Sequence, residues 1–267
     1  MKIGILGCAG RMGRMLASQV LSTDGAELIG GSEAPGSEFI GQDVAGLAGH
    51  DAAGIAVGDD TRALFQASDT VIDFTVPVAT AAHAQIAGET GTALIVGTTG
   101  LDAAQQNAIA NASALVAVVQ AANFSVGVNI LLGLTERAAG IMGDDYDIEV
   151  VEMHHRHKVD APSGTALALG QAAASGRGVD LESVSQRVRD GHTGPRKTGD
   201  IGFATLRGGD VAGDHTVVFA GDGERLELTH KAGNRAVFAS GAVRAALWTA
   251  GQSPGLYSMR DVLALTS

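Results

Sequence analysis

The sequence predicts a two-domain α/β protein in which a wound parallel sheet is followed by an α+β domain with a second, largely meandering sheet. Up to about residue 123, short apolar runs alternate with Ala-rich helical stretches, which is typical of strands joined by right-handed crossover helices. After residue 201, strand-like runs follow one another with only glycine-containing loops between them, which indicates a second sheet of a different kind.

The first domain begins with an apolar run at 2–6, a glycine turn and an amphipathic helix. Further strands are expected at 26–29, 71–76, 93–96 and 115–119, and helices at 14–21, 61–66, 78–88 and 102–112. Buried parallel strands suit the composition, because 45% of the residues are hydrophobic and only 4% are aromatic. The core must therefore be built mainly from aliphatic side chains.

The second domain is expected to start near residue 126. We expect helices at 128–141 and 163–174, and strands at 146–153, 186–189, 201–206, 215–219 and 225–229, the later ones forming a meander. A last helix, at 235–250, has an apolar face that would return to the first domain. The predicted domains are therefore 1–125 with 235–267, and 126–234. The polar segment 192–200 is a long loop, either functional or merely flexible.

Charge and cysteine content restrict the possible partners. The chain has 18 Lys and Arg against 29 Asp and Glu, a formal net charge of −11. Nucleic-acid binding needs the opposite excess, so we do not expect it. Cys8 is the single cysteine, no apolar leader precedes the first strand, and no run is long enough to span a membrane. We therefore expect a cytoplasmic protein with no membrane partner.

The glycine turn after the first strand resembles a dinucleotide-binding fingerprint. Gly7, Gly10 and Gly13 stand between a strand and a helix, and Glu33 follows twenty residues later, where a carboxylate would bind ribose hydroxyls. Glycines let backbone amides approach a pyrophosphate closely. The alternative is a tight turn that needs glycine for backbone geometry alone. The turn residues expected at the cofactor are Gly7, Cys8, Ala9, Gly10, Arg11 and Met12.

Two further loops follow predicted parallel strands and would line the same ligand crevice. Their small and hydroxyl-bearing residues would let a nicotinamide ring lie flat, although such residues are also ordinary in strand-to-helix turns. We expect cofactor contacts from Gly97, Thr98 and Thr99 in one loop and from Ala121, Ala122, Asn123 and Phe124 in the other. The predicted cofactor is NADH or NADPH.

The segment 152–165 concentrates three histidines with Arg156 and Lys158. His154 and Lys158 would share a face in a strand or in a helix, and histidine titrates near neutral pH. Ser163 is expected to cap a helix. The amides of Gly164 and Thr165, together with Lys158 and His155, would then bind a small dicarboxylate.

Two alternatives compete for this segment. A metal site is disfavoured, because the spacing matches no zinc motif and Arg156 and Lys158 would repel a cation, so we expect no metal. The other alternative is a solvated basic surface.

These motifs together identify a resemblance to the 4-hydroxy-tetrahydrodipicolinate (dihydrodipicolinate) reductase family. It rests on the glycine turn, Gly97-Thr-Thr-Gly100, Ala121-Ala-Asn-Phe-Ser125 and, above all, His-His-Arg-His-Lys-x-Asp-x-Pro-Ser-Gly-Thr ending at Thr165. The resemblance implies an N-terminal Rossmann domain with a parallel sheet and a second α+β domain with a mixed, open sheet for substrate binding and oligomerisation, usually in a homotetramer. It also implies a role in lysine and diaminopimelate synthesis.

The resemblance also implies roles for single residues. His154 corresponds to the catalytic acid/base and Lys158 to the proton donor, while His155, Gly164, Thr165 and Arg235 correspond to substrate contacts. The family often carries Arg directly after the acidic ribose-binding residue, where this chain has Ala34. We therefore expect NADH to be preferred or both cofactors to be used. Arg11 or Arg14 could still contact the 2′-phosphate of NADPH.

Two rival functions remain for comparison. An NAD(H)-sensing regulator would bind the cofactor without chemistry, but the proton-donor cluster argues against it. Another two-domain oxidoreductase, one acting on an amino-acid semialdehyde, would need a cysteine nucleophile, and Cys8 lies in the glycine turn instead.

Overall fold

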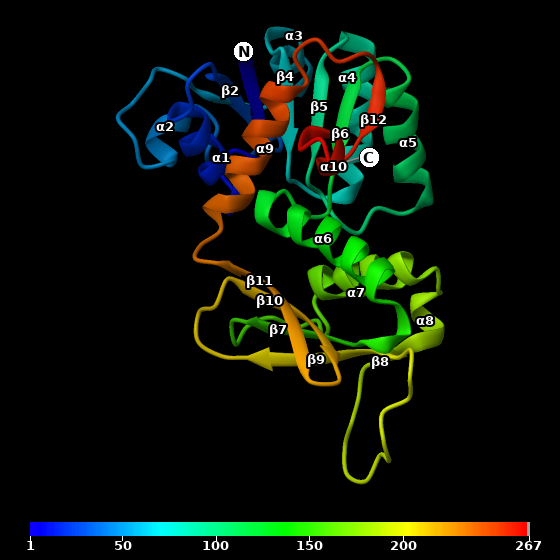
Figure 1. The fold of residues 1–267 in the computed structure, drawn as a ribbon. Coiled ribbons are helices and arrows are strands. Elements are labelled where there is room, and N and C mark those ends of the chain that lie inside the picture. Colours follow the sequence, from blue (N-terminus) through cyan, green and yellow to red (C-terminus); the bar gives the residue numbers. More distant parts are fainter. Residues whose placement is uncertain (266–267) are drawn as a thin grey trace. The chain divides into compact units, whose positions relative to one another are not determined.

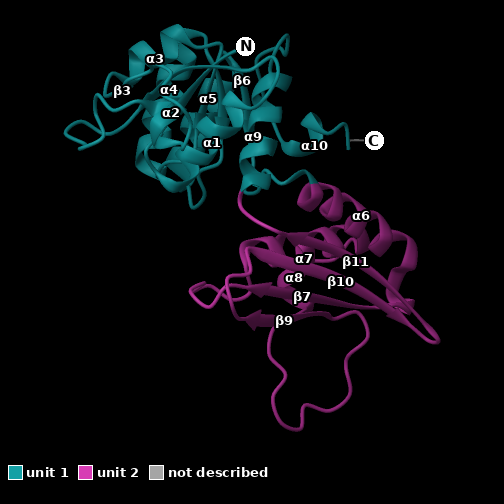
Figure 2. Cartoon of the chain, turned by 90° about the vertical axis from the view of Figure 1, so that its left-hand side faces the viewer, with its two compact units in different colours: residues 1–126, 236–267 teal, residues 127–235 magenta. Residues whose placement is uncertain are grey.

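A computed structural model describes residues 1–265 of the chain. It divides into two compact units, which Figure 2 colours separately: unit 1 comprises Met1–Val126 and the chain from Ala236 onward, and unit 2 is Gly127–Arg235. Unit 1 holds a parallel sheet covered by helices, and unit 2 holds a mixed sheet. The predicted fold class is confirmed.

The sheet of unit 1 has seven parallel strands in the order β12-β6-β5-β4-β1-β2-β3 (Figure 1). Their bounds are β1 Lys2–Leu6, β2 Glu27–Ser32, β3 Val57–Gly58, β4 Thr70–Asp73, β5 Ala93–Val96, β6 Ala117–Gln120 and β12 Gly255–Tyr257. The chain runs outward from β1 to β3, then crosses over to β4 and runs outward the other way. Ligands of such sheets bind at the carboxyl ends of the strands beside this reversal.

Helices cover both faces of this sheet and therefore bury its strands on both sides. On one face α1 (Arg11–Leu21), α9 (Ala236–Trp248) and α10 (Met259–Val262) pack on Ile3, Ile5 and Ile72. On the other, α3 (Thr61–Ala67), α4 (Pro77–Thr90) and α5 (Ala103–Ser113) pack on Leu6, Val71 and Leu94. The short α2 (Val44–Leu47) follows β2.

The sheet of unit 2 has the order β11-β10-β7-β9-β8. Its strands are β7 Asp147–His154, β8 Ser185–Gln186, β9 Ile201–Arg207, β10 Gly213–Gly221 and β11 Glu224–Ala232. Helices α6 (Val126–Met142) and α7 (Gly164–Arg177) share its apolar core, and α8 is Leu181–Val184. Side chains of β7 alternate between buried and half-buried, so every second residue of this central strand points into the core.

Several element predictions were wrong in detail. The later strands do not form a meander, because β7 lies between β9 and β10, parallel to the first and antiparallel to the second. The strand predicted at 71–76 ends at Asp73, whose carboxylate accepts from Thr75 N (2.8 Å) and turns the chain. The strand predicted at 186–189 is two residues long. The elements β3, β12, α2, α8 and α10 have too few residues to show a sequence period.

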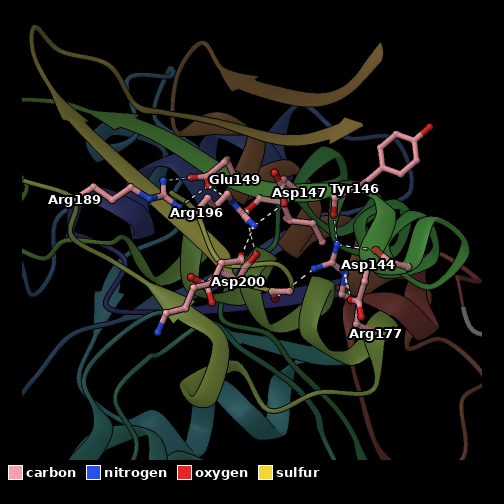
Figure 3. Close-up of polar contacts among 12 residues, drawn as sticks. Asp144, Tyr146, Asp147, Glu149, Arg177, Arg189, Arg196 and Asp200 are labelled. Atoms are coloured by element: carbon pink, nitrogen blue, oxygen red, sulfur yellow. Dashed lines mark hydrogen bonds and ion pairs between the residues drawn. The ribbon is translucent and has the colours of Figure 1, made fainter. Parts of the chain in front are cut away.

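The long loop between β8 and β9 is anchored to β7 by arginines (Figure 3). Arg189 donates hydrogen bonds from its two terminal nitrogens to the two carboxylate oxygens of Glu149 (2.7 and 2.9 Å). Arg196 donates to Glu149 (3.1 Å) and to Asp147 (2.7 Å). These contacts hold both ends of the loop on the unit 2 sheet. Within residues 1–265, no helix is both long and apolar enough to cross a membrane.

Candidate functional site

The glycine turn follows β1 at the carboxyl edge of the unit 1 sheet. Gly7 has φ +65°, and the amides of Gly7 and Cys8 donate to Ser32 O (2.8 and 3.3 Å). A Cβ on Gly13 would lie 2.1 Å from Gly7 O, so α1 packs on this turn only with glycine at that position. Backbone geometry alone therefore requires Gly7 and Gly13.

Gly10 meets a different requirement, since it is exposed and occupies the N-cap position of α1 without a side chain to cap the helix. An uncapped helix start at this edge suits a phosphate, because its amides and the helix dipole both favour negative charge. The side chains of Cys8 and Ala9 are buried, Met12 packs on the core and Arg11 is exposed. Cys8 and Ala9 also donate their amides to Ser32 O and Glu33, so a phosphate would meet the first amides of α1 instead.

Cys8 is excluded as a nucleophile. Its thiol is buried and lies against the strand β2 at Gly31, and burial, followed by the charge of Glu33, raises the pKa of Cys8 to about 12. A thiolate would therefore not form near neutral pH. A route through a cysteine acyl-enzyme is closed to this chain.

The carboxylate of Glu33 lies at the glycine turn, where its Oε1 accepts a hydrogen bond from Ala9 N (2.8 Å). A ribose bound over this turn would meet the carboxylate. Arg14 donates through Nε to Ala9 O (2.7 Å), and its guanidinium lies over the ring of Phe39 (5.4 Å). Its position is thus fixed by two neighbours, while Ala34 is exposed.

A buried carboxylate that no sequence motif indicated stands at the carboxyl end of β4. Asp73 is fully buried, with Oδ2 2.8 Å from His83 Nδ1 and Oδ1 accepting from Thr75 Oγ1 (2.6 Å) and Thr98 Oγ1 (3.4 Å). Thr80 of α4 also donates to Thr98 (2.8 Å). The cluster joins β4, α4 and the loop after β5, one of the two loops predicted to hold the nicotinamide.

The residues of the two predicted nicotinamide loops differ in their surroundings. Thr98 points into the protein, whereas Thr99 is exposed. A Cβ on Gly97 would lie 2.3 Å from the ring of Phe74, so glycine is needed there for packing. Phe124 is buried, with its ring 5.4 Å from that of Phe74.

The rest of the second loop is more open. Ala121 is half-buried, Ala122 is exposed, and Asn123 Oδ1 accepts from Ser125 N (2.8 Å).

Asp73 also gives unit 1 a pH dependence. Burial alone would raise the pKa of Asp73, but hydrogen bonds from His83 and Thr75 outweigh it and hold the pKa below its usual value. The ionised carboxylate therefore stabilises the fold above about pH 4, and this stabilisation is lost as the pH falls through the lowered folded-state pKa. We expect Asp73→Asn to lower the free energy of unfolding by about 1–2 kcal/mol at pH 7 and by less below pH 4.

The fluorescence of Trp248, which packs on the core of unit 1, would follow this unfolding against urea. A difference between wild type and variant that stays constant from pH 7 to pH 3 would contradict the assigned role of Asp73.

In unit 2, His154 ends β7 beside a buried carboxylate. Glu152 is 1% exposed, and its Oε2 lies 2.6 Å from His154 Nδ1. Arg207 of β9 binds both oxygens of Glu152 (2.8 and 3.0 Å), and Ser163 N donates to Oε1 (3.0 Å). The ring nitrogen that does not bond Glu152 is therefore Nε2, which lies beside Gly213, where a Cβ would be 2.9 Å away.

The chain turns directly after His154, so the segment that reaches Lys158 is neither a continuous strand nor a helix. The amide of Lys158 donates to His155 O (3.1 Å), which closes a turn. His154 and Lys158 therefore do not share a face through strand or helix period. The ammonium of Lys158 lies 2.9 Å from Asp160 Oδ1, and Arg156 and His157 are exposed.

Arg235 joins this cluster from the end of unit 2. Its Nη2 lies 3.4 Å from His155 Nε2, and since a guanidinium only donates, that nitrogen accepts. Partial burial, and then the charge of Arg235, lower the pKa of His155. His155 is thus neutral near pH 7 beside a fixed cation, an arrangement that suits an anionic ligand.

The start of α7 forms as the sequence predicts. Ser163 caps the helix by accepting from Ala166 N (3.2 Å), and Gly164 and Thr165 are its first two residues. Ser163 Oγ also lies 3.2 Å from Nε2 of His215, a buried histidine whose pKa is lowered to about 4 by burial and then by His154. The ring of His215 stands edge-on to that of His154, 5.0 Å away.

Arg207 and His215 were missed because they lie on other strands. In the sheet register, His215 pairs with Glu152 and Arg207 pairs with His154. Only a correct strand order would have brought them into view. Over the part of the chain that the structure describes, no group of three or more His, Cys, Asp or Glu could hold a metal ion.

Comparison with known families matches both parts of the chain. The family described as "Dihydrodipicolinate reductase, N-terminus" matches residues 1–124, and "Dihydrodipicolinate reductase, C-terminus" matches residues 127–263. The 4-hydroxy-tetrahydrodipicolinate reductase of Rhodopseudomonas palustris (strain HaA2) is 54% identical, covering 99% of this chain and 98% of its own. That of Alkalilimnicola ehrlichii is 54% identical, covering 99% of both.

Solved structures agree on the fold. A dipicolinate-bound dihydrodipicolinate reductase from Paenisporosarcina sp. TG-14 superposes with a TM-score of 0.77 at 22% identity, over 97% of each chain. A myo-inositol dehydrogenase from Lactobacillus casei, in complex with NAD(H) and myo-inositol, superposes with a TM-score of 0.60 at 13% identity, over 99% of this chain and 91% of its own. At such low identity these likenesses concern architecture alone.

Proposed function

The chain belongs to the dihydrodipicolinate reductase family, and from this premise we propose that it reduces 4-hydroxy-tetrahydrodipicolinate to tetrahydrodipicolinate with NADH or NADPH. The observation that carries the proposal is 54% identity over 99% of the chain to curated reductases. By the same resemblance the reaction serves diaminopimelate and lysine synthesis.

Unit 1 fits a dinucleotide. Gly10 has no side chain that could cap the start of α1, and the carboxylate of Glu33 lies at the glycine turn. In the proposal the turn Gly7–Met12 receives the pyrophosphate at the first amides of α1, those of Arg11 and Met12, Glu33 holds the ribose, and the loops at Gly97–Thr99 and Ala121–Phe124 hold the nicotinamide. When bound, the cofactor supplies a hydride.

Unit 2 supplies charge and protons for the substrate. The first amides of α7, at Gly164 and Thr165, bind one carboxylate with the help of the helix dipole, and Arg235, His155 and Lys158 neutralise the dianion. His154, through Nε2, and Lys158 handle protons. Each turnover consumes one proton with the hydride and releases the 4-hydroxyl group as water, so a donor beside the ring is required.

Substrate-dependent oxidation of the cofactor tests this proposal. Aspartate semialdehyde and pyruvate, supplied with a partner synthase, generate the substrate, and the absorbance of NADH or NADPH follows its reduction. We expect oxidation only when both precursors and the synthase are present. An NAD(H)-sensing regulator would bind the cofactor and leave its absorbance unchanged.

We propose that NADH is preferred or that both cofactors are used. Glu33 favours a free 2′-hydroxyl, exposed Ala34 offers no cation, and Arg14 is held by Ala9 O and Phe39. We expect kcat/KM with NADH to equal or exceed that with NADPH, and Ala34→Arg to raise the NADPH value roughly tenfold by a charged hydrogen bond.

Lys2→Arg, an exposed change at the opposite end of β1, is the matched control for added guanidinium and should leave the ratio unchanged. A strong preference of the wild type for NADPH would contradict the proposed cofactor choice.

We also propose a homotetramer in the cytoplasm. The outer strand β11 is mostly exposed from Glu224 to Thr229, and Leu206 and Leu226 stand partly exposed on this sheet. Such a surface suits burial against further copies of the chain. Light scattering on the purified protein measures the mass and would contradict the proposal if it gave a monomer.

A further inference from the structure

The buried carboxylate of Glu152 carries an inference that goes beyond the proposed function while resting on its assignment of His154. Glu152 lies on the central strand β7 with 1% of its surface exposed. A carboxylate in such a place is costly unless every oxygen is bonded, because its charge has lost its hydration. Four donors meet this need: two nitrogens of Arg207, the amide of Ser163 and the ring of His154.

These partners leave only one arrangement of the His154 ring. A carboxylate accepts and cannot donate, so the hydrogen at the 2.6 Å contact is carried by His154 Nδ1. In the neutral ring, Nε2 is then the unprotonated atom, and in the charged ring Nε2 carries the transferable proton. Arg207 prevents Glu152 from turning away, because its guanidinium holds both oxygens.

The same carboxylate also fixes the start of α7. The amide of Ser163 precedes the first residues of the helix, and its bond to Glu152 joins this helix start to the strand that carries His154. Glu152 therefore fixes the position of His154, the proposed proton donor, relative to the first amides of α7, the proposed carboxylate site, within unit 2.

We infer that Glu152 is a positioning residue, which holds His154 in the Nδ1–H tautomer and leaves Nε2 available for proton transfer. Glu152 also connects His154 to the helix start at Ser163, and Arg207 fixes the orientation of the Glu152 carboxylate. Other charged and titratable groups lie around the ring: His215 from β10 and, from the turn, His155 and Lys158. The partner of Nδ1 is Glu152 and none of these three groups.

The first test reads the tautomer directly and needs no activity. Nitrogen-15 NMR of histidine-labelled protein, at a pH where the ring is neutral, should show His154 protonated on Nδ1. In Glu152→Gln the amide nitrogen can donate to Nδ1, so a substantial fraction of the ring should change to the Nε2–H form. A wild-type His154 in the Nε2–H form, or an unchanged ring in the variant, overturns the inference even if the proposed reaction fails.

The second test reads the consequence for the reaction. We expect Glu152→Gln to lower kcat by roughly 10–10²-fold, as outer-shell partners of histidines do, with KM for NADH within about twofold. Loss of the adjacent charge disfavours a protonated imidazole, so the limb of the pH profile that reports the essential acid should move to lower pH. Glu152→Asp keeps the charge and should restore the position of that limb.

Glu149→Gln is the matched control. Glu149 lies on the same strand, is also bound by arginines, and is bonded to Arg189 and Arg196 rather than to His154. If Glu149→Gln lowers kcat as much as Glu152→Gln, or if the pH profile of Glu152→Gln matches wild type, Glu152 is merely structural and the inference is wrong.

Discussion

Lys158→Ala should lower kcat by roughly 10²–10⁴-fold, the range expected for removal of an acid–base group, while the affinity for NADH stays the same. Lys158 lies in the turn after His154, and its ammonium pairs with the half-exposed Asp160 (2.9 Å). Because Asp160 is half-exposed, water screens this pair and it contributes little to folding, so the loss should appear in turnover rather than in stability. Single-turnover kinetics and NADH titration by fluorescence measure the two quantities.

Lys197→Ala is the control for this change. Lys197 is an exposed lysine in the long loop of the same unit, distant in sequence from the His154 turn. It should retain wild-type kcat. Near-normal turnover of Lys158→Ala would remove the lysine from the proposed mechanism.

Gly13→Ala should destabilise unit 1 by about 3 kcal/mol or more and abolish measurable NADH binding. The added Cβ would lie 2.1 Å from Gly7 O and 2.6 Å from Cys8 Cα. Backbone atoms cannot rotate away as a side chain does, so α1 must move from the glycine turn that it extends. Urea unfolding followed by the fluorescence of Trp248, which belongs to the same core as α1, measures the change.

Gly58→Ala is the matched control, because a Cβ at that strand position meets no atom within 4 Å and the residue has no positive φ. It should stay within about 0.5 kcal/mol of wild type. A Gly13→Ala variant with wild-type stability and NADH affinity would mean that the turn tolerates a wider approach between α1 and β1.

The local signals of the sequence predicted most of the fold. The glycine turn between β1 and α1 and the Ser163 cap of α7 are formed by residues within a few positions of one another. Predictions failed where an element was short or where a side chain ended it. Asp73 stops β4 by bonding Thr75 N, although the apolar run continues to Val76.

The proposed site shows the same division. His154, His155 and Lys158 stand together in the sequence and were singled out for that reason. Their geometry was predicted wrongly, because the period of a strand or helix was applied to a segment that turns after His154. Asp73 was missed because its partner His83 lies ten residues away on α4, with a strand end and a loop between them.

By itself the sequence determined the class of each unit, the glycine turn, the start of α7 and the cluster of proton donors, since these depend on side chains that are near one another along the chain. Only the tertiary structure decided that Arg207 and His215 meet Glu152 and His154, because strand order and register place them there. Hydrophobic alternation specifies which face of a strand is buried. It leaves open which strand lies beside it, and therefore which charge a buried carboxylate meets.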